Sequence, residues 1–225
     1  MAAPPDLVAD LAAAVADLGE RHSRVLVGID GPDAAGKSIL ADRLTDALTG
    51  DVVRASIDRW HHPADVRRRA GALSPLGYYR DSFDLAGLDR ELLRPFQAGY
   101  PAVRTQAYDY CVERTVEAHP APVAARSVLV LDGVFLLRPE LRPRWTLAVR
   151  LEIPPAETLR RALLRDVAAF GSAAEVRTRY EKRYLPAQAL YDAEVDPRLH
   201  AHVVVDNTEP DLPRVTKWAV PSAPR

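Results

Sequence analysis

Cysteine is almost absent from this sequence of 225 residues, since Cys111 is the only one. A single cysteine excludes a disulfide bond within the chain and a metal site built from cysteines alone. No apolar run approaches the ~20 residues that a membrane-spanning helix needs. Residues 1–6 also lack the basic segment and apolar run of a secretory signal. We therefore expect a cytoplasmic protein.

A strong net charge is also lacking. The chain has 30 Lys and Arg against 31 Asp and Glu, which leaves a formal net charge of −1. Proteins that bind nucleic acid without sequence preference usually have a marked basic surface. We therefore expect a small-molecule ligand, with neither nucleic acid nor membrane as a partner, and leave a homo-oligomer open.

Short apolar runs alternate with amphipathic segments along the chain. The runs are typical of buried parallel strands and occupy residues 24–30, 52–57, 127–131, 147–153 and 202–205. Helical spacing predicts helices over residues 7–18, 37–48, 65–70, 87–97, 156–170 and 173–193. The last of these helices is expected to bend or break at Pro186. We also expect an extended hairpin over residues 103–116 and assign no element after Asn207. The pattern predicts an α/β fold with a five-stranded parallel sheet and helices on both faces.

The pattern G-x-x-x-x-G-K-[ST] occurs once, from Gly31 to Ser38, between a predicted strand and a predicted helix. Its glycines let backbone N–H groups converge on a phosphate at the positive end of a helix. Lys37 can reach the β- and γ-phosphates, and the Ser38 hydroxyl can bind Mg²⁺. Asp33 is unusual in a loop that surrounds anions, and we expect it to face solvent. The predicted nucleotide-binding residues are Gly31, Asp33, Ala34, Ala35, Gly36, Lys37, Ser38 and Ile39.

Asp132 ends the strongly apolar run VLVLD. A carboxylate at this place in a P-loop protein can help hold Mg²⁺, although an Asp at a strand end can also form a turn. Gly133 follows it, so the adjacent acid with which motor ATPases activate water is missing. The only asparagine is Asn207, so the Asn-Lys-x-Asp motif that reads guanine is missing too. These absences argue against a motor ATPase and a GTPase.

Asp58 ends the second predicted strand. The carboxyl ends of parallel strands line the ligand crevice of such sheets. Phosphoryl transfer to a hydroxyl uses a carboxylate that receives the hydroxyl proton, which makes Asp58 the candidate base. A simple turn at Asp58 is the alternative.

Four further motifs follow the P-loop in a fixed order, and together they resemble the uridine/cytidine kinase family of P-loop kinases. The likeness is greatest to short bacterial uridine kinase-like proteins and extends from about Val25 to Asn207. The motifs are Ser56-Ile57-Asp58 with nearby histidines, Ser82-Phe83-Asp84, Tyr108-Asp109-Tyr110 and Leu131-Asp132-Gly133-Val134. The resemblance implies a Mg²⁺-dependent ATP:nucleoside kinase of pyrimidine salvage, with uridine or cytidine phosphorylated on the 5′-hydroxyl.

The resemblance also implies roles for single residues. Asp58 would be the base, and Asp84 would bind the ribose hydroxyls. A lid helix would close over the phosphates, with Arg161 and Arg165 as its catalytic arginines. The implied substrate-binding residues are Asp84, Tyr108, Asp109, Tyr110, His61, Phe83 and Arg160. The implied organisation is a single domain over residues 1–225, with a substrate-binding excursion at about 59–120 and the lid at about 156–171.

Two segments depart from the family pattern. The family has a histidine after its Tyr-Asp-Phe segment, where this chain has Glu113 or Arg114. The family lid continues with a glycine between arginines, where residues 167–171 of this chain are neutral. A pantothenate-like or sugar-phosphate acceptor therefore stays open, as does an inactive nucleotide-binding regulator. The lid arginines can also form a solvated helix face.

Overall fold

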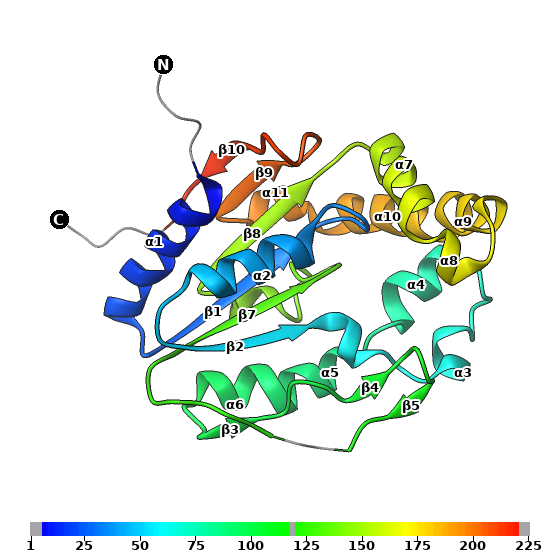
Figure 1. Ribbon diagram of the computed structural model, residues 1–225. Helices are drawn as coiled ribbons and strands as arrows, with labels where there is room; N and C mark the ends of the chain where they lie inside the picture. The colour runs from blue at the N-terminus through cyan, green and yellow to red at the C-terminus, as the bar shows by residue number, and fades with distance from the viewer. Residues whose placement is uncertain (1–5, 118–119, 221–225) are drawn as a thin grey trace.

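The computed structural model describes residues 6–117 and 120–220 (Figure 1). The prediction that no secretory signal is present falls mainly on residues 1–5, which lie outside the described range. Residues 118–119 of the predicted excursion lie outside it too. The central sheet has the strand order β10-β9-β8-β1-β7-β2. Its strands are β1 (Arg24–Asp30), β2 (Asp51–Ser56), β7 (Ser127–Gly133), β8 (Leu147–Glu152), β9 (Val203–Asp206) and β10 (Arg214–Trp218).

The five predicted strands are present and pair in parallel, which confirms the parallel core. The count of five is too low for the whole sheet, because β10 adds a sixth strand antiparallel to β9. Residues after Asn207 therefore do form an element, against our expectation. In β10 exposed and half-buried residues alternate, as an edge strand with one covered face requires. The strand could not be identified from the sequence because its five residues include two charges and so have a weak apolar pattern.

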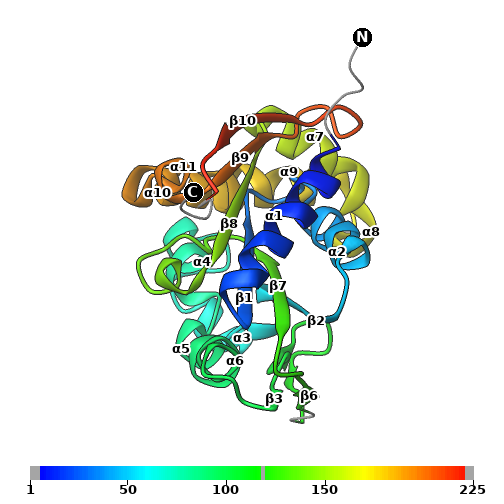
Figure 2. The ribbon, with the colours of Figure 1, turned by 90° about the vertical axis from the view of Figure 1, so that its left-hand side faces the viewer.

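Alternation along β1 explains why helices cover both faces of the sheet. Val25, Val27 and Ile29 belong to one apolar core with α1 (Leu7–Arg21) and α2 (Lys37–Ala47). Leu26 points the other way, into a core with aromatic residues such as Phe96. Figure 2 shows α1 and α2 on one side of the sheet. On the other side lie α4 (Pro75–Asp81), α5 (Leu85–Leu88), α6 (Arg94–Gln97), α10 (Leu185–Val195) and α11 (Pro197–His200).

Helix α4 was missed in the sequence, although its start has an ordinary signal. Ser74 caps it by accepting a hydrogen bond from the Gly77 N–H, and Pro75 stands in its first turn. The predicted helix over 87–97 is formed by α5 and α6 with a π-helical segment at Asp89–Leu93 between them. The helix predicted over 173–193 consists of α9 (Ala173–Arg179), a π-helical segment at Tyr180–Tyr184 and α10. The π-helical segment ends just before Pro186, at which the bend or break of the helix was predicted.

Residues between β2 and β7 form the predicted excursion. After a 3₁₀ turn at Ile57–Trp60 come α3 (Ala64–Arg67) and the helices α4 to α6. The hairpin is shorter than predicted, since β4 (Tyr108–Asp109) pairs with β5 (Arg114–Thr115). The strands β3 (Ala102–Val103) and β6 (Ala121–Pro122) form a second small ribbon. No helix in the described part of the chain is both long and apolar enough to cross a membrane.

The predicted lid corresponds to α7 (Pro155–Arg165) and α8 (Val167–Phe170). In Figure 1 these helices and α9 lie at the end of the sheet where the loops after β1, β2 and β7 also emerge. Parallel strands bring their carboxyl ends to one edge, so residues far apart in the sequence meet there.

Candidate active site

The loop from β1 to α2 has a backbone suited to an anion. Ala34 has φ +59° and Gly36 has φ +90°, both in the left-handed region. Left-handed residues within such a turn direct successive N–H groups into a concave nest. Helix α2 starts at Lys37 without a side-chain cap, so the N–H groups of its first turn are left for a ligand.

The other residues of this loop take different positions. A Cβ on Gly31 would meet the Leu151 carbonyl oxygen at 2.7 Å, so only glycine fits there. Ala35 is fully buried, whereas Ile39 is 67% exposed. The Lys37 Nζ donates a hydrogen bond to the Pro32 carbonyl oxygen at 2.7 Å, which folds the side chain over the loop.

Ser38 and Asp132 meet at the start of α2 and the end of β7. The Ser38 Oγ donates to Asp132 Oδ2 at 2.7 Å. Hydroxyl and carboxylate oxygens are the ligands that Mg²⁺ takes, so this pair fits that ion. The other oxygen, Oδ1, forms an ion pair with Arg54 Nη1 at 2.8 Å. Arg54 was not predicted, because no motif marks an arginine in the middle of a strand.

Asp58 lies in the 3₁₀ turn after β2, beside this pair. Strand β2 pairs with β7 so that Ser56 is opposite Asp132. Asp58 is exposed at the surface, yet loss of water around its carboxyl raises the pKa to about 6. Lys37 opposes this rise, whereas the negative charge of Asp132 adds to it. A carboxylate with a pKa near 6 is ionised at neutral pH and suited to take up a proton.

Asp33 does not face bulk solvent, so our expectation for this residue was wrong. The Tyr78 hydroxyl lies 3.3 Å from Asp33 Oδ1 and donates to it. The charge of Asp33 also raises the pKa of Asp58, Tyr180 and Tyr184, which places it among these groups. The P-loop carboxylate therefore lies near the candidate base, Asp58, and near Tyr180 and Tyr184. The direction of this loop side chain depends on α4 and on the π-helical segment Tyr180–Tyr184, which the local motif does not describe.

A group of ring side chains lies close to Asp58. The His61 Nδ1 lies 2.9 Å from the Asp58 carbonyl oxygen. Its ring centre is 4.6 Å from that of Phe83 and 5.1 Å from that of Tyr110. Burial lowers the pKa of His61 to about 4, so its ring is neutral at physiological pH. Three of the predicted substrate residues thus lie together beside the candidate base.

The remaining predicted substrate residues have other partners. Asp84 caps α5, where its Oδ1 accepts a hydrogen bond from the Gly87 N–H at 2.8 Å. Asp109 accepts one from the Cys111 N–H at 2.9 Å and so shapes the β4–β5 turn. The Tyr108 hydroxyl donates to Glu113 at 2.9 Å. No contact to Asp58 is recorded for these three side chains among the described residues.

The three lid arginines differ in their partners. Arg160 pairs with Glu157 and has 61% of its side chain exposed, as a solvated helix face would. Arg161 also contacts Glu157 and donates to the carbonyl oxygens of Asn207 and Ala34, so it joins the lid to the P-loop. Arg165 contacts Asp166 and the Tyr180 hydroxyl, and its charge acts on Asp58.

A cavity of about 640 Å³ lies next to the P-loop, and Asp58 is not among its lining residues. Asn207 lines it and donates from Nδ2 to the Ala35 carbonyl oxygen at 2.8 Å. Further lining residues are Ile39, Arg43, Arg160, Arg161, Asp211, Leu212 and Pro213. Sequence reasoning missed the contribution of residues 207–213, because the strand that positions them was not predicted.

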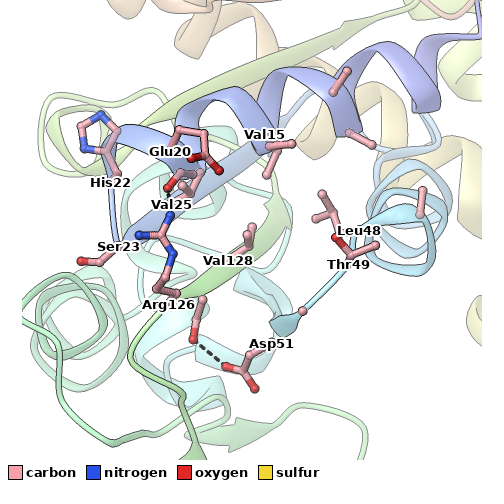
Figure 3. Close-up of a pocket in the computed structure, with 17 residues that line it drawn as sticks. Val15, Glu20, His22, Ser23, Val25, Leu48, Thr49, Asp51, Arg126 and Val128 are labelled. Carbon is pink, nitrogen blue, oxygen red and sulfur yellow. Dashed lines mark hydrogen bonds between the residues drawn. The ribbon is translucent and has the colours of Figure 1, made fainter.

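A second cavity of about 530 Å³ lies between α1, the end of α2 and the start of β7 (Figure 3). Two of its polar side chains have hydrogen-bond partners. Ser127 donates to Asp51 Oδ2 at 2.6 Å, and Arg126 donates to the Gly19 carbonyl oxygen. None of the candidate site residues lines this cavity.

Comparisons with known proteins give relatives in sequence and in structure. No protein-family model matches the sequence. The uridine kinase of Aeromonas hydrophila subsp. hydrophila is 28% identical over 184 residues, which cover 74% of this chain and 79% of that protein. A structure named as a possible uridine kinase from Bacillus stearothermophilus has a TM-score of 0.61 and 23% identity, covering 87% of this chain and 98% of that one.

A candidate fructose transport system kinase from Silicibacter sp. TM1040 is also similar in structure. Its TM-score is 0.70 at 22% identity, and the match covers 84% of this chain and 95% of that one. The chain thus has the fold of the P-loop kinases, and its sequence resembles the uridine kinases among them.

Proposed function

We propose that the protein is a small-molecule kinase that transfers the γ-phosphate of ATP to a hydroxyl group. The observation that carries this proposal is the meeting of the P-loop, the Ser38–Asp132 pair and Asp58 at one edge of the sheet. A phosphate-binding loop alone is compatible with hydrolysis or with mere binding. A carboxylate of raised pKa beside it favours transfer to an alcohol.

The N–H groups of the P-loop and the Lys37 ammonium would hold the phosphates, with the lid joined to the loop by Arg161. The 640 Å³ cavity beside Asn207 would take the nucleoside part of ATP, for which its size is suitable. Ser38 and Asp132 would hold Mg²⁺ through their oxygens. Bound Mg²⁺ neutralises charge that develops on the phosphoryl group.

Asp58 would accept the hydroxyl proton of the acceptor. With a pKa of about 6 it is ionised at pH 7, while His61, with a pKa of about 4, stays neutral and adds no charge. Arg165 would add positive charge near the transferring group, as guanidinium groups do in other phosphoryl transfers.

The relatives named uridine kinases favour uridine as the acceptor. The family resemblance of the motifs adds cytidine, the 5′-hydroxyl as the accepting group and a role in cytoplasmic pyrimidine salvage. His61, Phe83 and Tyr110 provide aromatic surface on which a base could stack. A second acceptor class, an acidic alcohol such as pantothenate or a sugar phosphate, is favoured by Arg183. This arginine is buried against the ring of Tyr78, whose centre lies 6.3 Å from that of Phe83.

An ADP-release assay with MgATP tests the proposal. Uridine, cytidine, pantothenate and sugar phosphates are each added, and we expect at least one to raise ADP release far above the rate without acceptor. The raised rate should need Mg²⁺ and should be lost in Lys37→Met. Background rates with every acceptor would argue for the nucleotide-binding regulator instead. Activity with a non-nucleoside only would leave the kinase proposal intact and reject the nucleosides.

A further inference from the structure

Arg183 is a buried cation on the acceptor side of the site. It lies in the π-helical segment Tyr180–Tyr184 and is 7% exposed. Its guanidinium carbon lies 5.3 Å from the ring centre of Tyr78 and 5.8 Å from that of Tyr184. Nη1 donates to the Ala72 carbonyl oxygen, but Nε has no hydrogen-bond partner among the described residues. The donor capacity of the guanidinium is therefore only partly used.

No ion pair between Arg183 and a carboxylate is recorded in the described part of the chain. Burial lowers the pKa of Arg183, and the positive charges of Arg67 and Arg179 lower it further, while Tyr184 and Tyr78 act in the opposite direction. Each of these two arginines has an acid of its own, since Arg67 contacts Glu113 at 2.6 Å and Arg179 contacts Glu175 at 2.8 Å. Arg183 thus adds a positive charge, balanced by no carboxylate of the described residues, to the surroundings of Tyr78 and Tyr184.

Two further arginines are as deeply buried among the described residues. Arg24, at the start of β1, also has no ion pair with a carboxylate of these residues and lies 5.1 Å from the Phe96 ring centre, whereas Arg150 shows the usual arrangement. Arg150 is 4% exposed and has two carboxylates, Asp30 at 2.6 Å and Asp192 at 2.8 Å. Buried charges are normally paired, because taking an ion out of water is costly without a partner. Two aromatic faces and one carbonyl oxygen compensate Arg183 less well than a carboxylate would.

Arg183 is also close to the reacting end of the site. The Tyr78 ring that it covers carries the hydroxyl that donates to Asp33 of the P-loop. The charge of Arg183 acts on His61, whose Nδ1 lies 2.9 Å from the Asp58 carbonyl oxygen. A small acceptor with its hydroxyl at Asp58 would therefore have Tyr78, His61 and Arg183 as neighbours.

We propose that the acceptor carries an anionic group, a carboxylate or a phosphate, that pairs with Arg183 while its hydroxyl lies at Asp58. This inference rests on the proposed kinase function and selects its acceptor class, an acidic alcohol rather than a neutral nucleoside. Arg183 is then a residue of acceptor specificity.

Matched acceptors that differ by one anionic group test the inference. The pairs are glycerate and glycerol, pantothenate and pantothenol, fructose 6-phosphate and fructose, and 3′-UMP and uridine. The first two pairs test a carboxylate, and the last two test a phosphate. We expect the anionic member of at least one pair to have a kcat/KM about 30-fold or more above its neutral partner. Equal values within every pair, or a preference for the neutral members, would overturn the inference while leaving the kinase proposal standing.

Three variants separate acceptor recognition from structural support. Arg183→Met keeps an apolar stem and should remove the preference for the anionic member, and Arg183→Lys should keep most of it. Arg177→Met is the matched control, because Arg177 is exposed on α9 and pairs with Glu181. It should leave the preference unchanged. If Arg183→Met lowers both members of a pair equally, Arg183 only supports the fold and the inference is wrong.

Binding to the wild-type protein provides a readout that needs neither turnover nor a folded variant. Calorimetric titrations with the same pairs are run in the presence of a non-hydrolysable ATP analogue. Tighter binding of an anionic member, weakened by added salt, supports the inference. Absence of any such difference overturns it. Anion-selective binding without ADP release for any acceptor would reject the kinase proposal and keep the anion site.

Discussion

Replacing Asp58 by asparagine removes the carboxylate that would accept the acceptor proton and keeps the size of the side chain. General base catalysis of this kind typically contributes about 10²- to 10⁴-fold to the rate. We expect kcat for Asp58→Asn to fall by about that factor. The KM for ATP should change little, because the groups proposed to hold the phosphates are unaltered.

The pKa of Asp58 sets the pH dependence. Since this pKa is about 6, nearly all of the carboxylate is ionised at pH 8 and roughly one tenth at pH 5. The wild-type kcat/KM should therefore be about tenfold lower at pH 5 than at pH 8. The pKa of His61 is about 4, so that side chain does not titrate in this range. A single acid limb is expected, and it should disappear in Asp58→Asn.

The same shift predicts an effect on stability. The folded-state pKa of about 6 is above the ordinary value of 3.8, so the ionised form of Asp58 opposes folding. This destabilisation is fully present above pH 6 and absent below pH 3.8. Asp58→Asn should accordingly raise the melting temperature at pH 8, and the gain should vanish at the acid end.

The assay couples ADP release to a spectroscopic signal and uses the best acceptor of the panel between pH 5 and 8. Asp46→Asn is the matched control, because Asp46 is exposed on α2, away from the site. It should behave as wild type. A kcat for Asp58→Asn within threefold of wild type, or a flat wild-type pH profile, would refute Asp58 as the base.

Three further changes test other parts of the structure. Asp132→Asn should reduce the gain in ATP affinity that Mg²⁺ provides, measured by titration with and without Mg²⁺. An equal gain in the variant and in the wild type would speak against a metal role. Asp30→Asn leaves Arg150 without one of its two acids and should cost about 3 to 5 kcal/mol in urea unfolding; a loss below 1 kcal/mol would contradict it. Gly28→Ala brings a Cβ to 2.6 Å from the Trp145 ring and should cost about 1 to 3 kcal/mol. Gly19→Ala, which meets nothing within 4 Å, should not destabilise.

The parallel core could be predicted because its signals are local. The apolar runs of β1, β7 and β8 are long enough to identify buried strands, and the P-loop motif defines the turn between β1 and α2. Strand β10 was missed because its burial depends on pairing with β9. Helix α4 was missed although Ser74 and Pro75 mark its start, because its buried face is made of aromatic residues that meet only in the folded chain.

The sequence by itself determined which groups the candidate site contains, since the P-loop, Asp58 and Asp132 stand at strand ends that a parallel sheet brings to one edge. Only the tertiary structure decided what each side chain meets. In the folded chain Asp33 lies beside Tyr78, Asp84 caps a helix, and Arg183 is buried without an ion pair to an acid among the described residues. The physical reason is that a motif specifies the local backbone, whereas burial and contacts such as Asp33 with Tyr78 and Arg183 with Ala72 join segments 45 and 111 residues apart.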